Sequence, residues 1–202
     1  MPRTPTTSRT NGHGRRHAAT PRLDIEGPEL QRFGTLRSLP IALPDTAKTK
    51  SCALLNEILA DSMILTALYK KHHWLVAGPT FYQLHLLFDK HAEEQLEIVD
   101  LLAERVQSLG GIAVGDPRHA AELTTIERAP DGAESVPGML ARLLAAHEVV
   151  ITKVRDAIER TDETKDWGTN DLLMGDVLRR NELQVWFVSA HLVDVELVPD
   201  GD

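Results

Sequence analysis

Two pairs of side chains in the second quarter of the chain have the types and the spacing of a metal site. His85 and Asp89 are four residues apart, and so are Asp100 and Glu104. Residues four apart on an α-helix share one face, with Cβ atoms roughly 5–6 Å apart. Each pair can therefore hold a metal ion from one side, because residues 80–109 show an unbroken helical pattern.

The two pairs cannot hold the same ion within one chain. Asp89 and Asp100 point nearly the same way on the helix, but they stand about 16 Å apart along its axis. An antiparallel copy of this helix would bring Asp100 and Glu104 of a second subunit to His85 and Asp89 of the first. The spacing predicts either two poor half-sites or a pair of complete sites related by a two-fold axis.

His73 joins the first pair by topology. It precedes the helix-breaking pair Gly78-Pro79, and His85 follows it, so an antiparallel helix pair places the two imidazoles close together. Two His and three carboxylates, with no thiolate, suit Fe(II), Mn(II) or Zn(II) better than an iron–sulfur cluster or Cu(I).

This region resembles the Dps family, the ferritin-like miniferritins known as DNA-binding proteins from starved cells. The match covers about Thr46 to Leu192. It is carried by the HHW sequence at 72–74, the spacing of His73, His85 and Asp89, the DxxxE pair of Asp100 and Glu104, and the AER and LGG sequences at 103–105 and 109–111.

The resemblance implies an iron-storing ferroxidase with two irons at each inter-subunit site. The ligands would be His73, His85 and Asp89 of one chain and Asp100 and Glu104 of its two-fold mate. Fe(II) would be oxidised, preferentially by hydrogen peroxide, and mineralised as Fe(III) in a hollow homododecamer that protects DNA and has no membrane partner.

The resemblance also suggests roles for other residues, each with a plain structural alternative. Trp74 is either an electron donor that quenches oxidants or a packing residue beside the turn. Acidic residues of the second long helix would nucleate mineral or form a solvated face, and acidic residues before the last helix would line an ion pore or a polar turn. These residues are Glu93, Glu94 and Glu97 for nucleation, and Asp166 and Asp171 for the pore, where Asp176 could substitute.

The other histidines have less specific surroundings. His72 is expected at the surface or in the turn, and His147 is expected to be a hydrogen-bonded core residue because it lies on an apolar helical stripe. His91 and His191 show no partner pattern.

Two other classes of protein remain to be weighed. One is a nucleoid-compacting DNA-binding protein with a vestigial metal site, and the complete ligand set argues against it. The other is a ferritin with a di-iron site inside each subunit, which requires Glu-x-x-His motifs on two helices. No Glu in this chain has a His three residues later, so the sequence excludes that class.

The charge is unevenly distributed. The net charge of the 202 residues is −8, yet residues 1–22 carry five arginines and no acid, which leaves −13 on the remainder. A tail of this composition is typical of a disordered segment. It either contacts DNA phosphates or tethers neighbouring subunits. The arginines are Arg3, Arg9, Arg15, Arg16 and Arg22.

The single cysteine, Cys52, excludes an intramolecular disulfide, and the chain begins without the apolar run of a signal peptide. We therefore expect a soluble protein of the cytoplasm or nucleoid.

The predicted fold is all-α, a ferritin-like four-helix bundle with a short extra helix in the crossover between helices two and three. Helices are expected at about 45–76, 80–109, 118–123, 137–161 and 171–193, with one further helical turn at 28–33. The predicted organisation is a disordered basic tail at 1–22, an N-terminal strap at 23–45, the bundle at 46–193 and an acidic C-terminal tail at 194–202.

Overall fold

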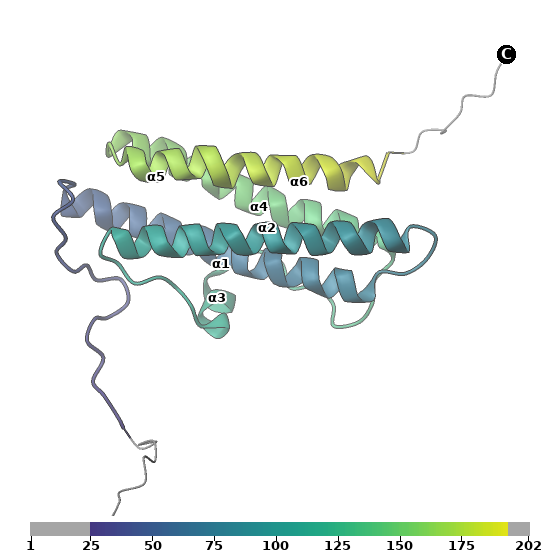
Figure 1. The fold of residues 1–202 in the computed structure, drawn as a ribbon, viewed down its shortest axis with the longest axis horizontal. Helices are drawn as coiled ribbons and strands as arrows, with labels where there is room; N and C mark the ends of the chain where they lie inside the picture. Colours follow the sequence, from purple (N-terminus) through teal and green to yellow (C-terminus); the bar gives the residue numbers. More distant parts are fainter. Residues whose placement is uncertain (1–24, 194–202) are drawn as a thin grey trace, which may run out of the picture. The chain divides into compact units, whose positions relative to one another are not determined.

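The structure is a computed structural model that describes residues 25–193. Four long helices lie side by side in it (Figure 1). Residues 25–30 belong to a separate unit, and all the helices lie in the unit that begins at Gln31. The described residues contain no β-strand, and the predicted all-α ferritin-like bundle is confirmed. The helices are α1 Asp45–Leu75, α2 Phe81–Ser108, α3 Pro117–Leu123, α4 Val136–Glu163, α5 Trp167–Leu172, the π-helical segment η1 Leu173–Leu178, and α6 Arg179–Ala190.

The turn between α1 and α2 places the end of one helix beside the start of the next. Gly78 adopts φ +103°, a conformation that an L side chain rarely takes. Pro79 follows it and cannot continue a helix from the preceding turn. The chain therefore reverses, and α1 and α2 pack along their length, as expected for the two halves of the predicted histidine cluster.

Gly110 ends α2 and anchors the segment before α1. Its φ is +89°, its N–H donates to the carbonyl of Gln107, and the next N–H donates to the carbonyl of Val106. These two bonds form a Schellman motif. A Cβ at position 110 would lie 2.3 Å from the carbonyl oxygen of Arg37, whose own N–H donates to Gly110. Only glycine fits both the backbone conformation and the close approach.

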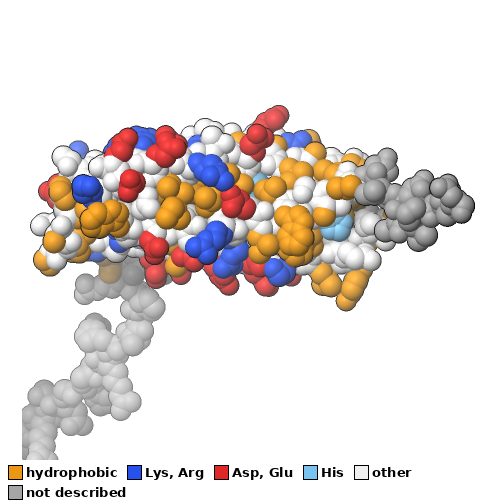
Figure 2. All heavy atoms as spheres, turned by 90° about the horizontal axis from the view of Figure 1, so that it is seen from above, with side chains coloured by type: hydrophobic (Ala, Val, Ile, Leu, Met, Phe, Trp, Pro, Cys, Tyr) orange, Lys and Arg blue, Asp and Glu red, His pale blue; other side chains and the backbone are white. Residues whose placement is uncertain are grey.

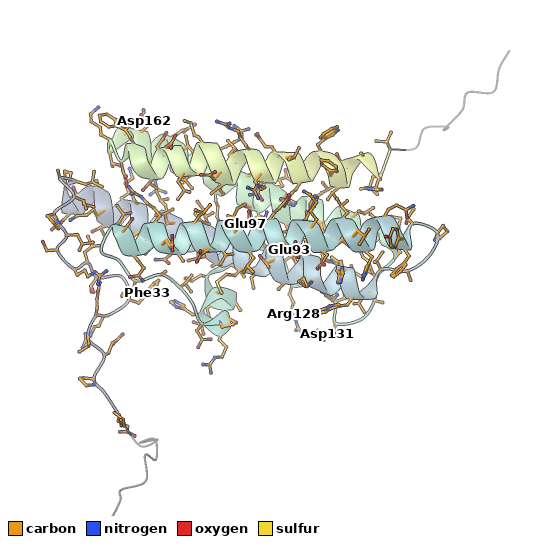
Figure 3. All side chains as sticks on the ribbon, in the orientation of Figure 1. Phe33, Glu93, Glu97, Arg128, Asp131 and Asp162 are labelled. Carbon is orange, nitrogen blue, oxygen red and sulfur yellow. The ribbon has the colours of Figure 1, made fainter. Side chains whose placement is uncertain are left out.

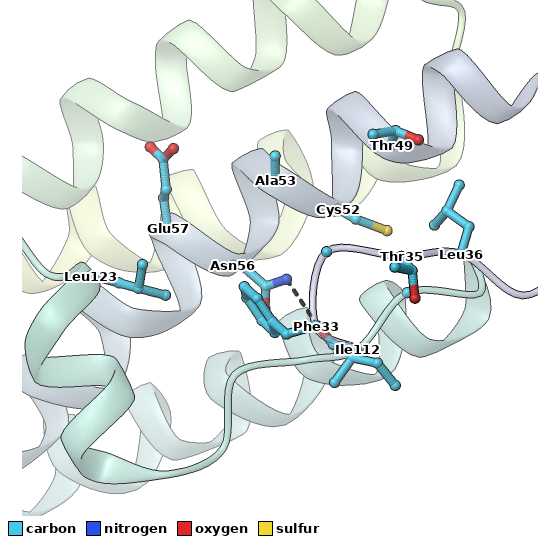
Figure 4. Close-up of a pocket in the computed structure, with 12 residues that line it drawn as sticks. Phe33, Thr35, Leu36, Thr49, Cys52, Ala53, Asn56, Glu57, Ile112 and Leu123 are labelled. Carbon is cyan, nitrogen blue, oxygen red and sulfur yellow. Dashed lines mark hydrogen bonds between the residues drawn. The ribbon is translucent and has the colours of Figure 1, made fainter. Parts of the chain in front are cut away.

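The N-terminal segment of the bundle unit is extended rather than helical. The helical turn expected at 28–33 is absent, and a turn forms instead at Phe33 and Gly34, where φ is +78°. A pocket of about 220 Å³ lies between this segment and α1, and Phe33, Cys52 and Asn56 are among the residues that line it (Figure 4). The side-chain amide of Asn56 donates to the carbonyl of Ile112 at 3.1 Å. Cys52 is 21 residues, about 30 Å along the helix, from His73.

The fourth long helix differs most from the sequence prediction. It begins at Trp167 and ends at Ala190, so it starts four residues earlier and stops three residues earlier than expected. The early start follows from Asp166, whose carboxylate accepts the backbone N–H of Thr169 as an N-cap. Six residues of its middle, Leu173–Leu178, are π-helical.

The bundle core is made by the inward faces of the four long helices, with α3 packed on α1. By length and composition alone α1 could cross a membrane, because the mean hydropathy of its most apolar window is 1.4. However, 67% of that window is buried in the bundle, as in a core helix. The face that carries α6 exposes hydrophobic side chains between charged ones (Figure 2). The largest fully buried side chains include Tyr69, Phe88, Leu55, Leu59, Leu65, Leu102 and Leu140.

Candidate metal centre

His73 and His85 hold each other through their backbones. The Nδ1 atom of His73 lies 2.8 Å from the carbonyl oxygen of His85, and Nδ1 of His85 lies 2.9 Å from the carbonyl oxygen of His73. The two rings stack at 3.8 Å between centroids with 19° between their planes. A carbonyl oxygen only accepts, so each Nδ1 carries a proton and donates it.

With each Nδ1–H held by a backbone carbonyl, Nε2 is the nitrogen of each ring that is left to bind a metal. A neutral imidazole whose Nδ1–H is held by a carbonyl is the usual form of a metal-ligating histidine, because that hydrogen bond fixes both the tautomer and the ring orientation. The carbonyl of His73 is also one of the last four of α1, which have no partner within a helix. The same hydrogen bond therefore closes the helix end and prepares a ligand.

Asp89 completes the predicted half-site from the next turn of α2. Its Oδ1 lies 3.9 Å from Nδ1 of His73 and accepts a short hydrogen bond from Nζ of Lys70. The hydrogen bond from Lys70 lowers the pKa of Asp89, and the nearby His73 and His85 act in the same direction. The carboxylate is thus ionised and ready to bind a cation, with Lys70 as the group that a cation would displace.

Asp100 and Glu104 lie farther along α2 and are exposed. Within residues 25–193 of one chain, no group of three or more His, Cys, Asp or Glu side chains is arranged to hold a metal ion. The structure therefore brings His73, His85 and Asp89 near one another without arranging them as a three-ligand site, and Asp100 and Glu104 lie farther along the same helix. Their union in a shared site stays a prediction that needs a second chain.

Exposed apolar side chains lie on the same face of α2 as the predicted ligands. Leu96 is 60% exposed. It lies between Asp89 and Asp100 in sequence, and at about 100° per residue it points within about 40° of both. Leu86 is a further exposed apolar residue on this side of α2. Exposed apolar side chains of this kind are typical of an interaction surface.

Comparison with known proteins identifies the family of this chain. A ferritin-like domain family matches residues 52–198. The solved structure of DpsC from Streptomyces coelicolor is 61% identical with a TM-score of 0.84, and the match covers 85% of this chain and 99% of that one. A DNA protection during starvation protein of Agrobacterium fabrum is 31% identical over 150 residues, which is 74% of this chain and 92% of that protein.

The chain belongs to the Dps family. A third relative of this family is the Dps protein from Vibrio cholerae O1, described as a member of a broad superfamily of ferritin-like diiron-carboxylate proteins. It is 25% identical with a TM-score of 0.73, and the match covers 79% of this chain and 99% of that one.

The residues suggested for iron entry in this Dps-family chain have different surroundings. Asp166 is 2% exposed, and Arg105 donates to it at 2.6 Å while Thr169 occupies its other oxygen. Burial raises the pKa of Asp166, but the hydrogen bonds from Thr169 and the charge of Arg105 outweigh it, so the net pKa is lowered. Its carboxylate is fully engaged as a helix cap. Asp171 and Asp176 are exposed, and a pore would have to use them.

The residues suggested for mineral nucleation also divide into free and engaged groups. Glu93 is exposed on α2 (Figure 3). Glu97 pairs with Arg180 at 2.9 Å, and Glu94 accepts hydrogen bonds from Lys90 and from Gln184 of α6. Of the three, Glu93 is the one whose carboxylate makes no ion pair or hydrogen bond within residues 25–193, and its role in nucleation stays a prediction. The five arginines of the tail lie outside the described residues, and Trp74 is 71% exposed beside the half-site.

A buried polar network in the bundle centre was missed by the sequence analysis. Tyr69 is 0% exposed, and its hydroxyl contacts Nε2 of His147 at 2.6 Å and Nδ1 of His91 at 3.1 Å. His147 is thus the hydrogen-bonded core residue that was expected, but His91 has a definite partner. The signal was available, because Tyr69 and His91 each fall on the inward face of its helix. The network continues through Asn181, Gln95 and Gln184.

The prediction for His72 was wrong. Its side chain is buried with 0% exposure, and neither ring nitrogen has a hydrogen-bond partner in the described chain. Burial lowers the pKa of His72 to about 4, as it does for His91 and His147. All three are therefore neutral near pH 7. The helix ends at Leu75, close to the predicted end at 76, but the sequence did not show that position 72 faces the core.

Proposed function

We propose that this protein is a ferroxidase that oxidises Fe(II), preferentially with hydrogen peroxide, at sites shared by two subunits, and stores the Fe(III) product inside a hollow dodecamer. The protein would thereby protect DNA from hydroxyl radicals. Membership of the Dps family supports the class of activity. The reciprocal His73–His85 pair carries the proposal for this chain, because the two hydrogen bonds orient the rings and leave Nε2 of each as its ligand atom.

The apolar face of α2 supports a shared site. The midpoint between Asp89 and Asp100 falls at residues 94–95, where an antiparallel copy of α2 would cross a two-fold axis. Leu96 is exposed next to that midpoint, as expected of a side chain that a second copy covers. About this axis Asp100 lies opposite Asp89, and Glu104 lies opposite His85.

The donor set fits Fe(II) as a substrate. Two imidazole nitrogens and three carboxylates are ligands that first-row divalent metals share, and the absence of thiolate disfavours Cu(I). His73 and His85 would orient the ion, while Asp89 and Glu104 would be bridging or terminal carboxylates. The protein contributes hard ligands and open positions for a second iron and for the oxidant, whose two-electron reduction consumes both Fe(II) ions.

The DNA component of the proposal depends on the tail. Five arginines in residues 1–22 give weak phosphate contacts in one chain, but many tails on one particle add through avidity. Binding of this kind weakens steeply as salt concentration rises, which distinguishes it from a base-specific contact.

The test is anaerobic loading of the full-length protein with Fe(II), followed by titration with hydrogen peroxide and sizing of the particle. We expect rapid oxidation at about one peroxide for every two Fe(II) ions, with iron co-eluting with a large assembly. Slow oxidation with iron precipitating outside the particle would contradict the proposal. The nucleoid-compacting alternative would then explain the chain better, and salt-dependent DNA retardation would be the measurement to make.

A further inference from the structure

Tyr69 lies between two histidines at the centre of the bundle. All three side chains are at most 1% exposed. The amide nitrogen of Asn181 donates to the carbonyl of Val177, so its Oδ1 is turned toward His147 and accepts from Nδ1 at 2.9 Å. Nδ1 of His147 therefore carries the proton, and Nε2 is the acceptor for the Tyr69 hydroxyl at 2.6 Å.

His91 completes the surroundings of the phenol. Its Nδ1 lies 3.1 Å from the Tyr69 oxygen, whose own O–H donates a hydrogen bond to His147, so His91 donates to that oxygen. The His91 ring also stands edge-on to Tyr69, with 5.2 Å between centroids. The phenol oxygen thus has one proton acceptor and one hydrogen-bond donor, both fixed and both out of contact with solvent.

The fourth helix is distorted where it reaches this network. The π-helical segment Leu173–Leu178 directly precedes Asn181 and Gln184, which both turn inward and are 0% exposed. Short π-helical segments are rare and occur frequently at functional sites. Asn181 and Gln184 also meet at Gln95, whose amide nitrogen donates to both at 3.1 and 2.8 Å. The fourth helix therefore holds His147 in one tautomer.

The tyrosine is also close to the iron half-site. Tyr69 precedes His73 by four residues on α1, so the two share a face and are about 6 Å apart along the axis. A phenol is oxidised readily only if its proton leaves at the same time, because the radical cation is strongly acidic. A neutral imidazole in direct contact takes that proton without help from water.

We propose that Tyr69 is a redox-active residue that gives one electron to hydrogen peroxide at the iron site and passes its phenolic proton to Nε2 of His147. This inference rests on the proposed ferroxidase function. It applies when a site holds one Fe(II) instead of two, so that peroxide lacks its second electron.

The reaction balances in atoms and charge. The O–O bond of the peroxide breaks, one electron comes from Fe(II) and one from Tyr69, and two protons from solution complete two water molecules. Fe(II) becomes Fe(III), the phenol becomes a neutral tyrosyl radical, and His147 becomes an imidazolium. A later Fe(II) reduces the radical, and His147 returns the proton. No hydroxyl radical leaves the site, and the radical that forms is buried, unlike one on the exposed Trp74.

The chain offers a matched control, because its only tyrosines are Tyr69 and the exposed Tyr82. Full-length protein is loaded anaerobically with about one Fe(II) per site, mixed with hydrogen peroxide and frozen for electron paramagnetic resonance. We compare the native protein, Tyr82→Phe and Tyr69→Phe, with ring-deuterated tyrosine to separate tyrosyl from tryptophanyl signals. Iron oxidation is followed in the same samples.

We expect a tyrosyl signal of native intensity in Tyr82→Phe, where Tyr69 is the only tyrosine, and its loss in Tyr69→Phe. At high field, the signal should show a hydrogen-bonded radical, which a merely structural tyrosine would not produce. Even if Tyr69→Phe folds poorly, Tyr82→Phe decides the question. Iron oxidation without a tyrosyl signal in Tyr82→Phe overturns this inference and leaves the ferroxidase proposal intact. Failure of iron oxidation in the native protein overturns both.

Discussion

The two histidine clusters of this protein are one helical turn apart and differ in whether they are complete. In the outer cluster, Nδ1 of His73 and Nδ1 of His85 each contact the other residue's backbone carbonyl, and the nearby Asp89 pairs with Lys70. In the inner cluster, Tyr69 and His147 are buried, and their polar atoms have partners within the same chain.

Helices α1 and α2 contribute residues to both clusters. Backbone carbonyls fix the outer histidines while their Nε2 atoms stay available, so the cluster depends on a ligand and on a second subunit for its completion. In the inner cluster, Asn181 and Tyr69 occupy the two ring nitrogens of His147, so that cluster is complete without a ligand or a second subunit. Changes to the outer cluster should therefore alter iron chemistry, and changes to the inner cluster should alter stability and proton movement.

The largest effect is expected from removing an outer ligand. His85→Ala should lower the rate of peroxide-driven Fe(II) oxidation by at least about 100-fold, because the site loses a nitrogen ligand and the hydrogen bond that closes α1. His191→Ala, at an exposed histidine after α6, is the control and should behave like the native protein. Native rates in His85→Ala would show that the outer cluster is not the iron site.

The inner cluster should make stability depend on pH. Burial lowers the pKa of His147 to about 4 in the folded state, whereas an unfolded histidine titrates near 6.5. Between these values the unfolded chain binds more protons, so the free energy of unfolding falls as the pH falls from about 6.5 to about 4. His147 contributes about 3 kcal/mol to this loss.

Urea unfolding of metal-free protein at several pH values measures this slope. His147→Gln, which has no titrating group, should reduce the slope in that interval without abolishing it, because burial also lowers the pKa of His72 and His91. An unchanged slope in the variant would mean that the folded state does not keep His147 neutral.

A smaller effect is expected from deleting one hydroxyl of the inner cluster. Tyr69→Phe leaves Nε2 of His147 buried without a donor, and the free energy of unfolding should fall by about 1–3 kcal/mol. The same deletion in Tyr82→Phe removes an exposed hydroxyl and should change it by less than about 0.5 kcal/mol. If chemical denaturation shows equal effects for the two variants, the buried hydroxyl of Tyr69 contributes no more to stability than the exposed hydroxyl of Tyr82.

The smallest effect is expected at Lys70. Lys70→Met frees Asp89 from its ion pair, which is worth at most about 1 kcal/mol at a partly exposed site. Calorimetric affinity for Zn(II), a redox-inert probe of the same ligands, should rise by up to about 5-fold. Lys90→Met, which breaks the pair with Glu94 on the outside of α2, is the control. Weaker Zn(II) binding in Lys70→Met would mean that Lys70 supports the site rather than competing for it.

Much of the outer cluster could be predicted from the sequence, because it depends on local spacing. The i,i+4 pair and the Gly78-Pro79 break place His73, His85 and Asp89 together without knowledge of the core. The helix boundaries of α1 and α2 followed from the same periodicity and from Gly110.

The inner cluster could not be predicted in the same way, because it joins residues from four helices that are far apart in sequence. The burial of His72 depends on where the last turn of α1 points, and the partners of Tyr69 depend on the packing of α2 and α4. The π-helical segment that precedes Asn181 has no recognisable sequence signal, and it decides which residues of the fourth helix face the core. Asp166 was assigned to a pore from its position, although the capping geometry with Thr169 engages it fully.

The central claim is that Asp89 of one chain and Asp100 of another serve the same iron site. Its most direct test is co-production of Asp89→Ala and Asp100→Ala chains with distinguishable tags, and measurement of Fe(II) oxidation in the mixed assembly. Each variant alone has every site damaged, but a mixed pair has one complete site and one that lacks both carboxylates. The mixture should recover roughly a quarter of the native activity. Activity no higher than that of either variant alone would contradict the shared site.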